Sequence, residues 1–417
     1  MSKQNYRLVP ELRFPEFEKE ANWPCVRLNA VAKRSTSKNK GEKITRVLTN
    51  SAVDGVVDQR DYFDKDIAVK GNLESYYTVD KGDYVYNPRI SSTAPVGPIS
   101  KNKVGEGVMS PLYTVFRFKS NKNDFFEQFF KSSRWHCYLQ TISNSGARHD
   151  RISITSSEFM AMPVPSPSDT EQQKIADCLA SIDELIVLHT RKLDAFKDHK
   201  KGLMQQLFPV EGETALKLRF SEFQGSAEWK PRILGKFLRE RNQIPREKVP
   251  LYSLTIEDGV SPKTERYERS FLVKNESEAY KLVKPLDFAY NPMNLRFGAI
   301  GMHSGSEDVA VSKYYNIFHC DDTVDARFCE IYFKSAAMVA LYNNVATGSL
   351  IEKRRVHFSN FLRFEIPFPQ LDEQRKIARV IDGITTIIDK QSQKVDSLKK
   401  HKKGLMQKLF PVMDEVV

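Results

Sequence analysis

The sequence predicts an α+β protein: two similar globular α+β domains, separated by two long antiparallel coiled-coil helices and related by a pseudo-two-fold axis. Three observations predict this fold class. The chain is an internal duplication that spans its whole length. Each copy ends with a helix that has a heptad pattern, and each copy contains short strands with alternating apolar residues. With 417 residues, of which 40% are hydrophobic, the chain is long and apolar enough for two domains with buried cores.

The internal repeat covers the whole chain. Three stretches recur, namely Leu-Arg-Phe-x-Glu-Phe, Tyr-Asn-Pro and His-Lys-Lys-Gly-Leu-Met-Gln-x-Leu-Phe-Pro, at residues 12–17 and 218–223, 86–88 and 290–292, and 199–209 and 401–411. Because landmarks from the beginning, the middle and the end recur in the same order, each copy is expected to be a domain followed by a helix.

Each copy closes with a long helix that has a heptad pattern. Apolar residues recur at steps of four and three, at Ile175, Leu179, Ile182, Ile186, Leu193 and Phe196 in the first copy and at Ile377, Ile381, Ile384, Ile388, Val395 and Leu398 in the second. Ser168 and Glu171 predict a capping box at the first start, and Pro209 and Pro411 predict the two ends. An isolated heptad run is more often a buried amphipathic helix, but two runs with interruptions at equivalent places favour pairing of the two helices.

The connectivity sets the direction of this pairing. The first helix must leave the first domain and arrive at the second, where the second helix starts, so a compact pair is antiparallel. From residue 175 to residue 207, at about 1.5 Å per residue, the pair forms a rod ~48 Å long. Two domains related by a two-fold axis across such a rod suit a target that is itself antiparallel. Duplex DNA with two separated half-sites is such a target.

Short strands and turns form the repeated framework of each domain. Residues 83–86 read Asp-Tyr-Val-Tyr and residues 287–290 read Asp-Phe-Ala-Tyr, a pattern typical of strands. Between such landmarks the copies differ, as the loops 89–95 and 293–299 show. A common framework with different loops is expected if the two domains read different short DNA sequences, and neutral drift of surface loops is the alternative.

The charge favours a polyanionic partner. The net charge is +11, from 64 basic and 53 acidic residues. A basic run is usually a solvated face, but here basic runs recur at matched positions of both copies, which favours contacts to DNA phosphates. The candidate DNA-binding residues are Lys33, Arg34, Lys38, Lys40, Arg89, Arg148 and Arg151 in the first copy, and Arg239, Arg241, Asn294, Arg296, Lys353, Arg354 and Arg355 in the second.

The sequence lacks the motifs of catalysis. Asn87-Pro88 and Asn291-Pro292 invite comparison with the Asn/Asp-Pro-Pro-aromatic motif of amino-methyltransferases, but Arg89 and Met293 follow them and no glycine-rich cofactor loop is present. No nucleotide-binding Gly-x-x-x-x-Gly-Lys-Ser/Thr loop, Pro-Asp nuclease motif or metal-ligand spacing of His and Cys occurs. The sequence therefore predicts a chain without catalytic residues, bound cofactor or metal.

The cysteines and the start of the chain predict a cytoplasmic protein. The five cysteines form no Cys-x-x-Cys pair, and the opening Met-Ser-Lys-Gln-Asn has no apolar run of a signal peptide. No apolar stretch approaches the roughly 20 residues that cross a bilayer.

The repeated motifs resemble those of a known family. These motifs are the Leu-Arg-Phe-Pro-Glu-Phe opening with Trp23, the Pro-Val-Pro and Ile-Pro-Phe-Pro runs that lead to Glu171-Gln172 and Glu373-Gln374, and the Gly-Leu-Met-Gln-x-Leu-Phe-Pro helix ends. Together they resemble the specificity subunit of type I restriction-modification systems, over nearly the whole chain. The resemblance implies target recognition domains at residues 1–167 and 211–369, and conserved helical spacers at residues 168–210 and 370–417.

The resemblance also implies a function within a complex. The chain would recognise a bipartite asymmetric DNA site, and partner subunits would methylate adenine and cleave the DNA. Two modification subunits would carry S-adenosylmethionine, and two restriction/translocase subunits would use ATP and Mg²⁺. A coiled-coil scaffold without sequence-specific DNA binding is the alternative. A methyltransferase in its own right is disfavoured by the missing cofactor motifs.

Overall fold

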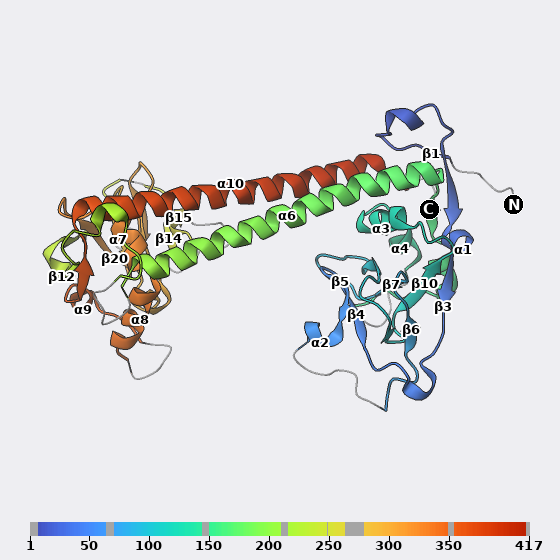
Figure 1. The fold of residues 1–417 in the computed structure, drawn as a ribbon, viewed down its shortest axis with the longest axis horizontal. Coiled ribbons are helices and arrows are strands. Elements are labelled where there is room, and N and C mark those ends of the chain that lie inside the picture. Colours follow the sequence, from blue (N-terminus) through green and yellow to red (C-terminus); the bar gives the residue numbers. More distant parts are fainter. Residues whose placement is uncertain are drawn as a thin grey trace. The chain divides into compact units, whose positions relative to one another are not determined.

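The chain folds into two compact units, unit 1 (Met1–His189 with Lys394–Val417) and unit 2 (Thr190–Gln393). The computed structural model describes residues 7–63, 71–143, 150–209, 216–247, 249–262, 279–348 and 354–413. Each unit combines antiparallel sheets with short helices, and two helices of 39 residues each, α6 (Asp169–Leu207) and α10 (Leu371–Leu409), run through both units (Figure 1). The predicted α+β fold with two long helices is confirmed.

Unit 1 is built on a four-stranded antiparallel sheet in the order β3-β10-β7-β8, at Ala32–Ser35, Thr114–Phe118, Tyr84–Tyr86 and Ile99–Lys101. A second sheet joins β1 (Arg7–Leu8), β2 (Trp23–Arg27) and β11 (Pro163–Pro165), and two strand pairs join β4 (Leu48–Ser51) to β5 (Gly55–Asp58) and β6 (Tyr77–Val79) to β9 (Gly107–Met109). The short helices are α1 (Leu28–Val31), α2 (Gln59–Tyr62), α3 (Asp124–Lys131), α4 (His136–Ile142) and α5 (Ser156–Met160), with 3-10 turns η1 (Pro15–Phe17) and η2 (Lys40–Glu42). Figure 1 shows α3 and α4 between this sheet and the first half of α6.

Unit 2 repeats this plan. Its four-stranded sheet has the order β13-β20-β17-β18, at Leu238–Glu240, Asn316–Cys320, Phe288–Tyr290 and Ile300–Met302. Paired strands are β12 (Lys230–Ile233) with β21 (Glu365–Phe368), β14 (Tyr252–Thr255) with β15 (Gly259–Pro262), and β16 (Tyr280–Val283) with β19 (Val309–Ser312). The helices are α7 (Ala326–Phe333), α8 (Ala336–Val345) and α9 (Phe358–Phe361), with 3-10 turns η3 (Ser221–Phe223), η4 (Leu234–Lys236) and η8 (Leu295–Phe297).

The sheet of each unit has two apolar faces, because successive side chains of a strand point to opposite sides. Tyr84 and Tyr86 of β7 join the core that α3 and α6 cover, whereas Val85 joins a smaller core on the other face, under the strand pairs. In unit 2, Phe288 and Tyr290 of β17 make the corresponding split from Ala289. The alternation in the sequence therefore serves a sheet that is buried on both sides.

The long helices complete the core of each unit in an antiparallel arrangement. In unit 1 the start of α6, with Ile175 and Leu179, shares a core with the end of α10, with Met406 and Leu409. In unit 2 the end of α6 and the start of α10 share the other core, through Leu207, Ile377 and Ile381. The other heptad residues predicted to pair the two helices are buried or half-buried. Buried are Ile182, Leu193 and Val395, and half-buried are Ile186, Phe196, Ile384, Ile388 and Leu398.

Two equivalent backbone hydrogen bonds show how segment 394–413 serves unit 1. In unit 2 the Leu218 N–H donates to the carbonyl of Gln206, 3.0 Å away, a short step along the chain. In unit 1 the Leu12 N–H donates to the carbonyl of Lys408, also 3.0 Å away. The end of α10 therefore contacts the opening motif of unit 1 in the same way as the end of α6 contacts the opening motif of unit 2.

Among the described residues, no helix combines the length and the apolar character that crossing a membrane requires.

Candidate nucleic-acid interface

A buried carboxylate fixes the opening motif of each unit to the start of a long helix. In unit 1 the Glu171 carboxylate accepts hydrogen bonds from Arg13 Nε and Nη2, both at 2.7 Å, and from Trp23 Nε1 at 2.9 Å. In unit 2 Glu373 accepts from Arg219 at 2.9 and 2.7 Å and from Trp229 Nε1 at 3.2 Å. Both carboxylates lie in the first turn of their helix, where the helix dipole favours negative charge. The repeated Leu-Arg-Phe and Trp motifs are therefore explained by this scaffold.

Replacing Arg13 with lysine should destabilise unit 1 by about 1.5–3 kcal/mol, because lysine keeps the charge but cannot make the two-bond contact to Glu171. Urea unfolding followed by tryptophan fluorescence measures this loss. Arg219→Lys should cost a similar amount in unit 2. Arg375→Lys is the control, since that exposed arginine pairs with the exposed Asp372 at 3.6 Å and its replacement should change little.

Four basic candidates of unit 1 lie along the edge strand β3 and the segment that follows it. Lys33, Arg34 and Lys40 are exposed, and Lys38 Nζ lies 3.9 Å from the centre of the Tyr77 ring and donates to the Ser75 carbonyl at 2.6 Å. The Arg34 guanidinium also lies over Tyr77, at 5.9 Å. The sequence interleaves basic and aromatic residues here, but their stacking could not be read from it.

The loop after the Asn-Pro turn meets the same partner segment in both units. The Ile152 N–H donates to the Pro88 carbonyl, and the Val356 N–H donates to the Pro292 carbonyl, each at 3.0 Å. These equivalent contacts join the divergent loops to the basic segments that precede Ile152 and Val356. They define a repeated pair of loops, which we call the paired loops: residues 89–95 with 150–151 in unit 1, and residues 293–297 with 354–355 in unit 2.

The paired loops of unit 1 bring together two arginines that are 62 positions apart in the sequence. Arg89 and Arg151 form an antiparallel bridge, and each pairs with Asp150, at 3.6 and 3.7 Å. Arg148, also a candidate, lies outside the described residues. Because Asp150 is half exposed, these ion pairs are weak and leave the guanidinium groups available to a phosphate.

The paired loops of unit 2 combine basic and aromatic side chains. Arg296 lies 4.2 Å from the centre of the Phe297 ring, and Phe297 is 51% exposed, which is unusual for so large an apolar side chain. Asn294 is exposed at the start of this turn, and Arg354 and Arg355 are exposed on the other loop. Lys353 lies outside the described residues. Sequence reasoning missed Phe297, because nothing in the sequence marks a phenylalanine as exposed.

Two candidates of unit 2 are instead engaged within the unit. Arg241 Nε donates to Asp287 Oδ2 at 2.5 Å, and the Asp287 side chain is only 1% exposed. Arg239 pairs with Asp321 at 3.2 Å and donates to the carbonyls of Gly235 and Lys236. In unit 1 the aspartate equivalent to Asp287 is Asp83, which pairs with Arg117 from a different strand, also at 2.5 Å. The buried aspartate needs an arginine, so the geometry favours an internal role for Arg241.

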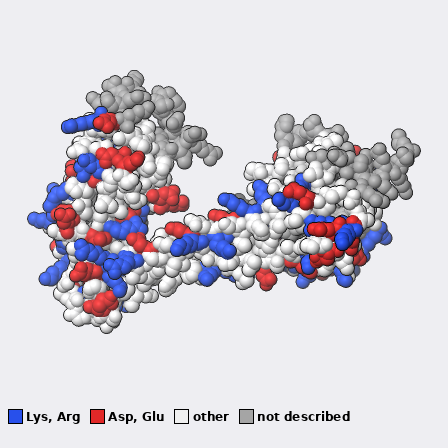
Figure 2. Space-filling view, turned by 90° about the horizontal axis from the view of Figure 1, so that it is seen from above, with Lys and Arg blue, Asp and Glu red and all other residues white. Residues whose placement is uncertain are grey.

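The electrostatic surface is mixed. Figure 2 shows Lys and Arg interspersed with Asp and Glu on the visible face of each unit. Among the described residues, no group of three or more His, Cys, Asp or Glu side chains could hold a metal ion. The arrangement suits local contacts from loops on a fixed framework.

Comparison with known proteins bears on this arrangement. Residues 31–197 match the family model described as the type I restriction modification DNA specificity domain. A solved chain from work on complex assembly and conformational transition of the type I R-M system is similar with a TM-score of 0.56 and 14% identity, over 97% of this chain and 99% of that chain. The S subunit of a type I restriction-modification system from M. genitalium is similar with a TM-score of 0.54 and 12% identity, over the same shares of the two chains. At these identities the structural similarity shows a shared fold.

Proposed function

Because residues 31–197 match the family model of the type I restriction modification DNA specificity domain, we propose that this chain is the DNA-specificity subunit of a type I restriction-modification complex. Unit 2 repeats the sheet order and the paired loops of unit 1, so it would be a second recognition unit of the same kind. Each unit would read one half of a bipartite asymmetric DNA site.

The observation that carries this proposal is the pair of equivalent contacts at Pro88 and Pro292, which hold loops of different sequence at one place of a common framework. Arginine and asparagine, which these loops contain, hydrogen-bond to guanine and adenine in the major groove. Different loops on the same framework would therefore give two different half-sites.

Mapping methylated adenines in DNA from cells that carry this chain and its modification partner tests the proposal. A bipartite asymmetric motif that disappears when the chain is deleted is the expected result. Methylation that persists unchanged would instead favour the coiled-coil scaffold.

The chemistry would reside in the partners. We expect modification subunits to carry S-adenosylmethionine and restriction subunits to use ATP and Mg²⁺, with two copies of each, because the chain is an internal duplication. A DNA-directed role of this kind would be exercised in the cytoplasm. Calorimetry should detect no binding of S-adenosylmethionine to the purified chain, and saturable binding would contradict this division of labour.

Neutralising Arg354 and Arg355 together by glutamine should weaken DNA binding of the assembled complex across all sequences. Each lost phosphate contact should reduce the slope of log K against log salt by about 0.9, because fewer counterions are released. The control is Arg375→Gln with Arg379→Gln, two exposed arginines of α10 whose loss changes the net charge equally. If the slope of log K against log salt were equal for both double variants, Arg354 and Arg355 would contribute to DNA binding only through the net charge of the chain and not through phosphate contacts.

A further inference from the structure

Each unit contains a groove beside the repeated Lys-Lys-Gly-Leu-Met-Gln stretch that DNA recognition leaves unused. The unit 1 groove has a volume of about 880 Å³ and the unit 2 groove about 790 Å³. Five equivalent residues line them, Lys399, Lys402, Lys403, Met406 and Gln407 in unit 1 and Lys197, Lys200, Lys201, Met204 and Gln205 in unit 2. The opposite wall comes from the end of α3 or α7, with Lys131 and Lys334 at equivalent positions.

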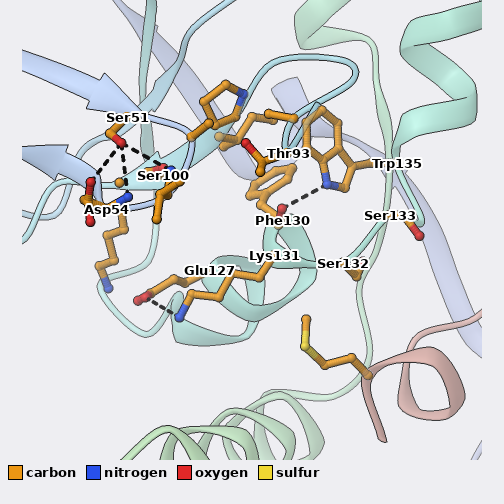
Figure 3. A pocket seen from close by; sticks show the side chains of 18 of the residues that line it. Ser51, Asp54, Thr93, Ser100, Glu127, Phe130, Lys131, Ser132, Ser133 and Trp135 are labelled. Carbon is orange, nitrogen blue, oxygen red and sulfur yellow. Dashed lines mark hydrogen bonds and ion pairs between the residues drawn. The ribbon is translucent and has the colours of Figure 1, made fainter. Parts of the chain in front are cut away.

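In the unit 1 groove, one carboxylate pairs with two of the lysines. Lys402 Nζ donates to both carboxylate oxygens of Asp183 at 2.6 Å, and Lys131 Nζ lies 3.4 Å from the same carboxylate. Burial opposes the charge of Asp183, but the Lys402 hydrogen bond and the charge of Lys131 lower its pKa overall. Lys131 also pairs with Glu127 on α3, 3.2 Å away. Figure 3 shows this pair on one side of the groove and the rings of Phe130 and Trp135 on another.

In the unit 2 groove Lys334 pairs with Glu330 at 3.4 Å, but Lys200 has no counterpart of the Asp183 carboxylate. Thr385 stands where the first copy has Asp183, and its hydroxyl donates to the Ile381 carbonyl of its own helix at 2.8 Å. Within the described part of the chain, the half-buried Lys200 has no carboxylate within ion-pair distance, and burial lowers its pKa. Two carboxylates nearby favour the charge of Lys200, Asp382 and Asp389, but Asp382 is paired with Arg327 at 2.6 Å and Asp389 lies beyond ion-pair distance of Lys200. Among the described residues, the charged side chains that line the groove are all basic, Lys197, Lys200, Lys201, Lys217 and Lys334.

The unit 2 groove is also lined by apolar residues, which we call its apolar floor. Met204 and Ile388 line it from the long helices, Phe208 lines it from just beyond the end of α6, and Ala336, Ala337 and Ala340 line it from α8. Small side chains on a helix allow another helix to approach closely. In unit 1 the corresponding wall carries Arg134, Trp135 and His136.

We propose that the unit 2 groove binds an acidic amphipathic helix of a partner protein, with its carboxylates on the lysines and its aliphatic side on the apolar floor. The unit 1 groove binds the same helix more weakly, because Asp183 already occupies Lys402. The two ends of a duplicated chain therefore differ in their partner affinity through a single pair of positions, 183 and 385. This inference goes beyond the DNA-specificity function and does not depend on it.

Calorimetric titration of the full chain with an unlabelled peptide of about 18 residues tests this proposal, the peptide being five helical turns with glutamates on one side and leucines on the other. One tight site per chain is expected. Lys201→Glu should weaken it about tenfold or more, whereas the equivalent Lys403→Glu should leave it within about twofold, both lysines being exposed.

Substitutions at positions 183 and 385 add a test in which one variant gains binding. A variant that fails to fold could not produce that result. Thr385→Asp gives Lys200 an internal partner and should weaken the tight site about tenfold. Asp183→Thr frees Lys402 and should raise the stoichiometry from one peptide to two. No binding, equal effects of Lys201→Glu and Lys403→Glu, or an inert Thr385→Asp would overturn the proposal. Displacement of the peptide by a short DNA duplex would also overturn it, by assigning the lysines to phosphates.

Discussion

Replacement of Phe410 by alanine should destabilise unit 1 by about 3–5 kcal/mol, the usual cost of removing a buried aromatic ring from a packed core. The Phe410 side chain is fully buried, and its ring lies 5.5 Å from that of Phe125 and 5.6 Å from that of Phe129 on α3. Phe410 lies far from these partners in sequence, so no local element can compensate for its loss. Unit 1 should unfold at a lower denaturant concentration than in the parent chain.

The tryptophans separate the two units in this experiment. Trp23 and Trp135 belong to the core of unit 1 and Trp229 to that of unit 2, so Trp229→Phe makes fluorescence report unit 1 alone. The matched variant is Phe208→Ala, which removes the ring that stacks on Tyr332 at 4.9 Å in unit 2. It should leave the unit 1 transition in place. A Phe410→Ala variant that unfolds like the parent would show that the end of α10 contributes little to unit 1.

Exchange of residues 24–160 for those of another specificity subunit should replace one half of the methylated site and leave the other half intact. The exchanged segment contains both paired loops of unit 1, including Arg89 and Arg151, and leaves Arg13, Trp23 and Glu171 in place. Because the loops of unit 2 are untouched, its half-site should persist. The expected effect is a complete change of sequence preference at one half-site, which methylome sequencing reads directly.

The reciprocal exchange of residues 230–362 is the control, since this segment begins after Trp229 as the other begins after Trp23. It should change the opposite half-site. If either exchange altered both halves together, the recognition units would not be separate, and the assignment of one half-site to each would be wrong.

The repeated part of the sequence carried most of the prediction of the fold. Tyr-Asn-Pro at both 86–88 and 290–292 predicted equivalent strands and turns, and β7 and β17 end there with equivalent neighbours in their sheets. The heptad residues predicted two helices with matching ends. A pattern within one copy indicates which local segments form strands, turns and helices, and these elements need few contacts with distant segments to be predicted.

What the sequence could not show depends on contacts between distant segments. Arg241 belongs to a basic run in the sequence, but in the structure it pairs with the buried Asp287. In unit 1 the equivalent buried aspartate, Asp83, pairs with Arg117 instead. Similarly, the sequence could not show that the end of α10, with Met406 and Phe410, packs into the core of unit 1. The domain ranges expected from the sequence stay predictions. Charge runs and heptads do not reveal which partner a side chain will meet. The remaining candidate DNA contacts stay predictions for the same reason.

The place of Phe410 in the unit 1 core has a consequence for biosynthesis. Unit 2 consists of one uninterrupted stretch, Thr190–Gln393, and can fold as soon as that stretch has left the ribosome. Unit 1 must wait for Met406, Leu409, Phe410 and Met413, although its sheets are made first. At about 5–20 residues per second, translation from residue 189 to residue 413 takes roughly 10–45 s, during which the apolar face that α10 will cover stays open. The nascent chain therefore matures in the reverse of its order of synthesis, and unit 1 is the part most in need of a chaperone.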